Sequence, residues 1–357
     1  MSDAAPAVKI VNASDPLEIE KAAQVLKEGG LVAFPTETVY GLGADAFNSK
    51  AVARVFEVKK RPTFDPLIVH VGSPKEAASL WTETPETAKI LMEKFWPGPL
   101  TLVLPKNDKI PDIVNAGLPT VAVRMPDHPA ALALIRALRN PIAAPSANYF
   151  GYTSATTAAD VSEDLGSAID LVLDGGPTRI GIESTVLKIE EGRCLLLRPG
   201  GISVEEIKKY FPVVIPSGAA PGVFESPGTM KSHYAPWTPF VLLEETVPKF
   251  LEKLKSFQAI FQKKELGWPR IGLVLFSKAP RTNLVETIEL LSAKGDLHEA
   301  AANLFQAMRK LDKMHLDLMV AEPLSEKGVG YAIMDRLRKA SAGNKGIDKF
   351  FEERSHE

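Results

Sequence analysis

The chain has 357 residues, of which 45% are hydrophobic and 24% are charged, and its formal net charge is −2. This length and composition indicate a folded protein with two domains, and the near-neutral charge argues against a domain-wide basic surface that coats nucleic acid or anionic membranes. A local basic cleft is still compatible with this net charge. The single cysteine, Cys194, excludes an internal disulfide and a thiolate metal cluster.

The first 23 residues carry acidic side chains and lack the basic and apolar layout of a signal or transit peptide. No apolar run approaches the ~18 residues needed to span a bilayer. Together with the single cysteine, these features predict a soluble cytoplasmic protein without a membrane partner.

The first third of the chain predicts a helix, strand, turn, helix and strand. A helix over 16–29 ends at Gly29-Gly30, and the buried strand LVAFPT follows it. The strand leads into Thr36, Thr38 and Tyr40 and then Gly41-Leu42-Gly43, which we interpret as a turn at a pocket. A helix over 49–60 is broken by RPTFDP before the strand LIVHV.

The middle of the chain continues the alternation of helices and strands. Expected helices cover 75–95, with a break near Pro85, 128–139 and 158–166. Expected strands cover 97–105, 120–126 and 168–176, and residues 142–148 are expected to form a strand that leads into a turn. A hairpin around Glu191-Gly192 should end at Arg198. Together with the first third, this pattern predicts an α/β domain over 16–205.

A stretch rich in Pro, Gly and Ser predicts a flexible linker over 206–237. A second α/β rhythm over 238–345 follows, with strands at 240–245, 271–277 and 316–322 and helices at 248–260, 297–314 and 331–341. This pattern predicts a smaller Rossmann-like domain. It lacks GxGxxG after its first strand, so a dinucleotide site is not supported.

Basic side chains are grouped at the end of the 49–60 helix, where Lys59, Lys60 and Arg61 lie. They could form a solvated cap that complements the helix dipole. Arg124 and Arg198 also fall at strand positions, however, and several cations converging on a crevice could hold polyphosphate.

Each of the other candidate side chains can also be explained by an ordinary structural role. Thr36, Thr38 and Tyr40 could be β-formers, His70 could be a hydrogen-bonded core residue, and the turns PSAN and EST could satisfy nearby backbone groups. There is no P-loop, HExxH or GxSxG pattern. Composition alone leaves a Ser-His-Asp hydrolase open.

Seven motifs taken in order resemble the YrdC/Sua-type family, the L-threonylcarbamoyladenylate synthases: PTETVYGLG, KKRPxxxPLIVH, FWPGPLT, TVAVRMPDHP, PSAN, ESTV and LRPGG. The linker SPGTMKSHYAP and the terminal GVGYAIMDRLRKAS resemble the longer, two-domain branch, so the resemblance covers about residues 16–345. It implies a twisted mixed sheet with a basic cavity in the first domain.

The resemblance also implies an activity. The enzyme would join L-threonine, bicarbonate and ATP into threonylcarbamoyl-AMP and pyrophosphate, with Mg²⁺ held by the ATP phosphates and by no direct protein ligand. A separate transferase machinery would then pass the group to the adenosine beside the tRNA anticodon. The linker would act as a lid over the site, and a weak contact with tRNA is compatible with this reading.

Residues carried over by motif fall into two groups. The L-threonine side comprises Thr38, His70, Arg124 and Ser184. The ATP side comprises Arg61, Asp65, Thr120, Ser146, Ser154, Arg198 and the linker residue Tyr234, with Lys59 serving both sides and Lys59 and Arg61 as the catalytic cations. Asp65 departs from the family, which commonly has Asn there, so it could act through magnesium instead.

Two other functions stay open from the sequence. A basic concavity could grip RNA without catalysis, but an RNA groove favours aromatic side chains near its cations, and this chain has few. The fold could also belong to a carbamoyl-transferring domain of the hydrogenase maturation type, but such proteins carry zinc-finger cysteines that are absent here.

Overall fold

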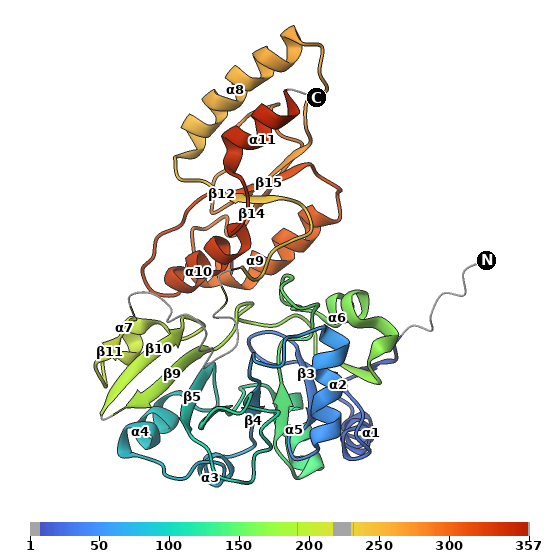
Figure 1. The fold of residues 1–357 in the computed structure, drawn as a ribbon, viewed down its shortest axis with the longest axis vertical. Coiled ribbons are helices and arrows are strands. Elements are labelled where there is room, and N and C mark those ends of the chain that lie inside the picture. The colour runs from blue at the N-terminus through green and yellow to red at the C-terminus, as the bar shows by residue number, and fades with distance from the viewer. Residues whose placement is uncertain (1–7, 191, 217–229, 231, 356–357) are drawn as a thin grey trace, which may run out of the picture. The chain divides into compact units, whose positions relative to one another are not determined.

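The computed structural model describes residues 8–190, 192–216, 230 and 232–355. The chain forms two compact units (Figure 1). The first comprises Met1–Phe150 and Ser154–Met230, and the second comprises Gly151–Thr153 and Lys231–Glu357. The expected α/β class is confirmed in both.

A mixed sheet of eleven strands, counted over the described residues, forms the first unit. In sheet order the strands are β1 (Ile10–Asn12), β8 (Leu171–Asp174), β2 (Val32–Phe34), β3 (Gly41–Asp45), β7 (Ile142–Ala144), β4 (Ile68–His70), β6 (Thr120–Arg124), β5 (Leu100–Pro105), β9 (Thr185–Glu190), β10 (Arg193–Arg198) and β11 (Val213–Val214). The pairs β4–β6 and β5–β9 are parallel, whereas β5–β6 and β9–β10 are antiparallel.

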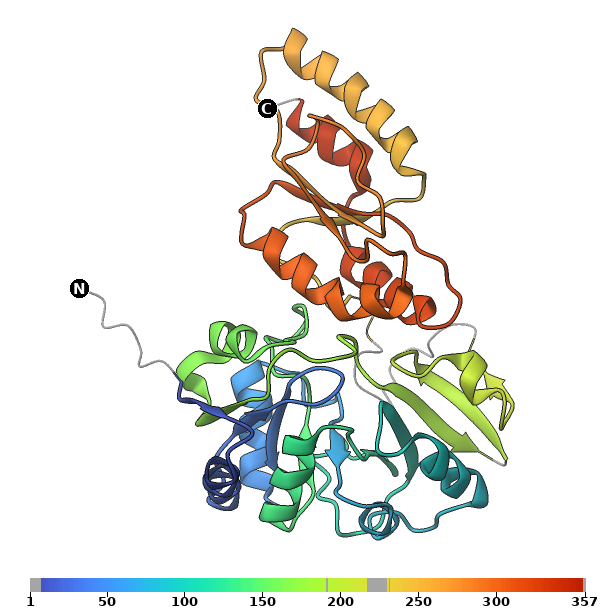
Figure 2. The same ribbon diagram turned by 180° about the vertical axis from the view of Figure 1, so that it is seen from behind.

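Helices start where the sequence supplies caps. The side chains of Asp15 and Asn48 accept backbone N–H groups at the starts of the first two helices, as short polar residues do at an N-cap. The helices are α1 (Pro16–Lys27), α2 (Ser49–Lys59), α3 (Pro74–Ala78), α4 (Glu86–Phe95), α5 (Pro129–Leu138), α6 (Ala158–Leu165) and α7 (Val204–Ile207), with a 3₁₀ turn at Gly166–Ala168. The apolar faces of α1 and α5 pack in one core with β2 and β8, at the opposite end of the unit from β9, β10 and α7 (Figure 2).

The expected turn at Gly41-Leu42-Gly43 is wrong, because these residues begin strand β3, which runs antiparallel to β2. The glycines permit close packing. A Cβ added at Gly43 would lie 2.8 Å from Ile142 Cγ2 and 2.9 Å from Phe34 Cε1. The strand therefore needs glycine for space in the core, and the sequence pattern alone indicated only a chain reversal.

In the second unit the sheet is parallel throughout its described strands, in the order β12 (Phe240–Leu242), β15 (Leu318–Ala321), β13 (Ile271–Leu275) and β14 (Thr287–Leu290). Helices α8 (Val247–Lys263) and α11 (Gly346–Arg354) lie on one side of it, and α9 (Leu297–Asp312) and α10 (Gly330–Ser341) lie on the other (Figure 1). Phe250, Phe261 and Phe351 join the strands in its core. Strand β14 and helix α11 were not expected from the sequence.

The predicted linker, 206–237, is only partly visible as a separate segment. Strand β11 lies within it and pairs with β10, so residues up to 214 belong to the sheet of the first unit. Residues 217–229 and 231 lie outside the described residues, and the expected lid falls largely on them. No helix in the described part of the chain is long and apolar enough to cross a membrane.

The second unit includes a short segment from the middle of the sequence, Gly151–Thr153. The Tyr152 hydroxyl donates to Asp312 Oδ2 over 2.8 Å, and its ring stacks on Trp237. Arg309 Nη2 donates to the carbonyl of Thr153 over 2.7 Å, and its guanidinium lies over the Tyr152 ring. These contacts fix the segment to α9.

Replacing Gly43 with alanine should destabilise the first unit by about 1–3 kcal/mol, because Phe34 and Ile142 must move to admit the methyl group. The measurement is the free energy of unfolding in denaturant. Gly72→Ala is the control, since its added Cβ would make only ordinary contacts at 3.4 Å or more. Equal stability of the two variants would contradict the packing role of Gly43.

Candidate functional site

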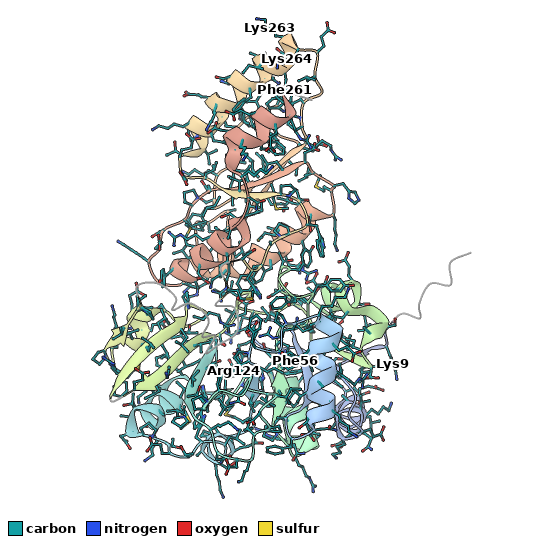
Figure 3. All side chains as sticks on the ribbon, in the orientation of Figure 1. Lys9, Phe56, Arg124, Phe261, Lys263 and Lys264 are labelled. Carbon is teal, nitrogen blue, oxygen red and sulfur yellow. The ribbon has the colours of Figure 1, made fainter. Side chains whose placement is uncertain are left out.

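Two expected site residues, His70 and Arg124, end the neighbouring parallel strands β4 and β6. They are direct register partners, so both side chains lie on the same face of the sheet. Arg124 is 3% exposed and lies in the interior of the first unit (Figure 3). The sequence correctly predicts a sheet-face position for Arg124, but that face is covered.

The loop between β2 and β3 supplies the groups that hold Arg124. Its Nη1 donates to Thr38 Oγ1 over 3.0 Å, and its Nη2 lies 3.2 Å from Glu37 Oε2 in a buried ion pair. Thr36 Oγ1 is 2.8 Å from Thr38 Oγ1 and donates to the carbonyl of Val39. The PTET sequence is therefore a hydrogen-bonded turn built around the guanidinium, rather than a run of β-formers.

Three buried polar atoms in this part of the site have no hydrogen-bond partner among the described residues: Arg124 Nε, Glu37 Oε1 and His70 Nδ1. Each residue is at most 5% exposed. Buried polar groups in folded proteins are nearly always paired, so a cluster of unpaired donors and acceptors indicates a place for a polar ligand.

His70 is a neutral imidazole in the folded protein. Burial, together with the nearby Arg124 charge, lowers its pKa to about 3. Its ring also meets Phe34 edge-on, with centroids 5.7 Å apart. His70 is thus packed as a core residue, as one interpretation of the sequence expected. Its Nδ1 atom, which has no partner among the described residues, can still form a hydrogen bond with a ligand.

Ser184 and Arg198 are buried and are hydrogen-bonded to each other. The Arg198 guanidinium donates to both the carbonyl and the hydroxyl of Ser184, over 3.0 and 3.1 Å from Nη2, and Ser184 Oγ is 2.8 Å from Thr101 Oγ1. A register shift between Leu196 and Arg198 against β9 sets this geometry. Such a bulge re-aims the side chain that follows it.

The basic end of α2 divides into buried and exposed cations. Lys60 adopts a left-handed conformation with φ of 51° and is exposed, which sends its neighbours Lys59 and Arg61 inward, to 1% and 6% exposure. Lys59 Nζ donates to the carbonyls of Ser146, over 2.6 Å, and Asn148. The solvated-cap interpretation therefore holds for Lys60 alone.

Asp65 lies beside Arg61, with Oδ1 2.8 Å from Nη2, and the pair is almost fully buried. Arg61 also donates to the carbonyls of Asp65 and Pro66, so the KKRPTFDP loop closes on its own arginine. Burial raises the pKa of Asp65, while Arg61, Arg198 and Lys59 oppose the rise. The Asp65 carboxyl group therefore lies within electrostatic reach of Lys59, Arg61 and Arg198.

The Arg198 charge influences the pKa of two other site residues, Asp65 and Arg124. The pKa of Arg124 is lowered by burial first and by Arg198 in addition, against the opposing effect of Glu37. The structure therefore gathers Lys59, Arg61, Arg124 and Arg198 into one buried basic region. Arg54 does not join it, since Arg54 pairs with Asp170 at the surface.

Not every predicted residue contacts this region directly. Ser154 donates to Glu183, and both are buried. Thr120 begins β6, four residues before Arg124 and thus about 13 Å from it, and its assignment to the nucleotide stays a prediction. Tyr234 belongs to the second unit, where the Arg336 guanidinium lies 5.1 Å from its ring centre, and its role likewise stays a prediction.

Glu37, Glu183, Thr101 and Asn148 were missed from the sequence. Glu37 and Glu183 lie inside the very motifs used, PTET and EST, as acids beside hydroxyl residues. The position of each acid next to hydroxyl residues was the sequence feature that could have identified it as a site residue. Thr101 and Asn148 gave none that distinguishes them from ordinary strand and turn residues.

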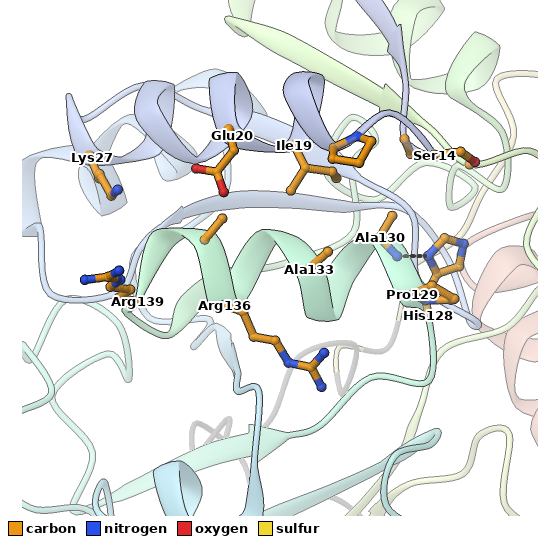
Figure 4. A pocket seen from close by; sticks show the side chains of 14 residues that line it. Ser14, Ile19, Glu20, Lys27, His128, Pro129, Ala130, Ala133, Arg136 and Arg139 are labelled. Atoms are coloured by element: carbon orange, nitrogen blue, oxygen red, sulfur yellow. Dashed lines mark hydrogen bonds between the residues drawn. The ribbon is translucent and has the colours of Figure 1, made fainter.

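A cavity of about 850 Å³ lies elsewhere, between α1 and α5. Figure 4 shows Glu20 on α1 above the small side chains of α5, Lys27 near Arg139, and His128 accepting the N–H of Ala130 at the start of α5. None of the predicted site residues lines it. This cavity is therefore separate from the buried cations.

Comparison with known proteins assigns the chain to a family. A family model for Sua5, YciO and YrdC proteins, described as Telomere recombination, matches residues 24–200, and one described as Threonylcarbamoyl-AMP synthase, C-terminal domain, matches residues 202–342. The threonylcarbamoyl-AMP synthase of Pyrococcus abyssi is 44% identical over 341 residues, which are 93% of this chain and 97% of that protein. The chain belongs to the threonylcarbamoyl-AMP synthase family. The resemblance inferred from the seven motifs is thus confirmed.

Other relatives extend the comparison. The threonylcarbamoyl-AMP synthase of Bacillus subtilis is 43% identical over 337 residues, covering 93% of this chain and 95% of its own. That of Halorhodospira halophila is 36% identical over 178 residues, which are half of this chain but 92% of the relative. The crystal structure of P. abyssi Sua5 complexed with L-threonine matches with a TM-score of 0.84 at 42% identity, covering 94% of this chain and 97% of that one.

Replacing His70 with glutamine should flatten the dependence of stability on acid pH. The unfolded chain protonates this histidine near its ordinary pKa of 6.5, whereas the folded protein does so only near 3. Between these values the unfolded state binds more protons, so lowering the pH costs up to about 1.4 kcal/mol of stability per pH unit. Denaturant unfolding from pH 6.5 to 4.5 measures the slope. Identical slopes in wild type and variant would contradict a neutral, buried His70.

Proposed function

We propose that this protein synthesises L-threonylcarbamoyladenylate and pyrophosphate from L-threonine, bicarbonate and ATP. The observation that supports this most directly is the buried basic region, where four cations lie beside unpaired polar atoms in one unit. Polyanionic nucleotide and an amino acid carboxylate together supply the negative charge that such a region requires.

The L-threonine end comprises Thr38, His70, Arg124 and Ser184. Arg124 offers its unpaired Nε to the α-carboxylate, and the neutral His70 offers Nδ1 to the amino acid. Ser184, held by Arg198 and Thr101, closes this end. The Sua5 structure solved with L-threonine supports the assignment of this substrate to the fold.

Within the first unit, the proposed ATP end comprises Arg61, Asp65, Thr120, Ser146, Ser154 and Arg198. Arg61 and Arg198 supply positive charge for the phosphates, and Lys59 lies between Ser146 and Asn148, where its ammonium can serve both the phosphates and the reacting carboxylate. Asp65 holds Arg61 in place through their ion pair, so its part in nucleotide binding acts through the arginine.

The reaction places few demands on a protein base. The amine of L-threonine and bicarbonate form a carbamate with loss of water, and a carbamate oxygen attacks the α-phosphorus while pyrophosphate departs in line. Negative charge develops on the phosphate oxygens, so positioning and fixed cations are the main contributions. Lys59, Arg61 and Arg198 fit that requirement because they are held before the substrates arrive.

Magnesium enters this proposal as part of the ATP substrate. In the described residues no group of three or more His, Cys, Asp or Glu side chains forms a metal site. Asp65, the carboxylate placed among the cations, is paired with Arg61. When bound, Mg²⁺ would neutralise charge on the phosphates that hold it.

The product belongs to tRNA modification in this proposal. Threonylcarbamoyl-AMP would pass in the cytoplasm to a separate transferase machinery that modifies the adenosine beside the anticodon. An RNA-binding module is less well supported, because Lys59, Arg61, Arg124 and Arg198 are each at most 6% exposed and so do not form an open surface for a duplex.

The purified protein should release pyrophosphate from ATP only when L-threonine and bicarbonate are both present, and a coupled pyrophosphate assay measures this. Equal release without L-threonine would overturn the proposal.

Lys59→Met keeps the apolar stem and removes the ammonium, so pyrophosphate release should fall by about 10²–10³-fold. Lys60→Met is the matched control, since Lys60 is exposed and should tolerate the change within about twofold. Similar activity of the two variants would remove Lys59 from the site.

A further inference from the structure

Glu37 is a buried carboxylate that the proposed reaction leaves without a task. It lies between Thr36 and Thr38 in the loop that joins β2 to β3, and it is 2% exposed. A charged group at this depth is costly unless it is paired. Its placement therefore requires an explanation beyond the hydroxyl residues beside it.

A single oxygen of Glu37 joins two elements of the threonine end. Oε2 accepts Nη2 of Arg124 over 3.2 Å and the backbone N–H of Asp127 over 3.0 Å. The main-chain carbonyl of Glu37 also accepts the N–H of Ile180 over 2.8 Å. The loop, the end of β6 and the segment before β9 are thus held together at one residue.

The electrostatics of Arg124 show why an anion is needed there. Its guanidinium is buried with Arg198 close by, and both effects disfavour its charge, whereas Glu37 favours it. With Nη1 bonded to Thr38 and Nη2 to Glu37, the guanidinium plane is fixed at two corners. The Nε–H on the remaining edge stays without a partner among the described residues.

We propose that Glu37 is a positioning residue that holds Arg124 with its Nε edge turned to the α-carboxylate of L-threonine. This inference rests on the proposed function, since it concerns the same substrate. Glu37 acts through Arg124, so its effect should be felt by ligands that carry a carboxylate and not by those that lack one.

Calorimetric binding of two ligands in the absence of ATP tests this. L-threonine carries the α-carboxylate, and L-threoninol has a hydroxymethyl group in its place. Glu37→Gln keeps the shape and removes the charge, so affinity for L-threonine should fall by about tenfold or more, while affinity for L-threoninol stays within about twofold. An equal loss for both ligands would indicate a purely structural role and overturn the proposal, as would no loss for either.

Two further variants keep the test decisive. Asp45→Asn removes another buried carboxylate of the first unit, one that is bonded to Asn140 and Phe47, and it should bind both ligands as wild type does. Glu37→Asp keeps the charge but is too short to reach both Arg124 and the N–H of Asp127, so it should lose affinity for L-threonine alone. Unchanged affinity for L-threonine in a folded Glu37→Asp variant would overturn the positioning role.

A double variant shows whether Glu37 acts through the arginine. If it does, adding Glu37→Gln to Arg124→Gln should lower affinity for L-threonine no further, whereas independent effects would multiply. Failure of the wild type to bind L-threonine would count against the proposed function itself. Binding by the wild type with no pyrophosphate release would count against the reaction and leave the role of Glu37 standing.

Discussion

The burial of four cations in one unit is the constraint that shapes the rest of the site. A guanidinium or ammonium removed from water needs fixed partners, and each one here has them before any substrate arrives. Lys59 has two backbone carbonyls, Arg61 has Asp65 and its own loop, Arg124 has Glu37 and Thr38, and Arg198 has Ser184. The motifs along the chain are the residues that meet this requirement.

This arrangement gives the two carboxylates of the region separate tasks. Glu37 forms a buried ion pair with Arg124, and Asp65 forms one with Arg61. An acid at position 65 forms an ion pair with Arg61 that an amide side chain could not form.

The sequence predicted most elements of the first unit because their helices carry caps and their strands carry long apolar runs, as with Asp15 before α1 and LTLVLP in β5. The prediction of a turn was wrong at β3. Glycine is common both in turns and in closely packed strands, and only the position of the Phe34 ring against Gly43 shows that close packing applies here. Motifs located the cations and hydroxyls. The motifs could not show that Lys60 is exposed while Lys59 and Arg61 are buried. The left-handed backbone conformation of Lys60 at the helix end directs these side chains, and a motif does not reveal it.

The membership of Gly151–Thr153 in the second unit affects how this chain can be divided. The chain passes between the units three times, at 150–151, 153–154 and 230–231. A cut in the connector therefore does not separate two complete units: a polypeptide that starts at 231 lacks Tyr152, and Asp312 loses its phenol partner while Trp237 loses the ring it stacks on. The second unit is therefore not a contiguous stretch of sequence, and no single cut in the chain releases it whole.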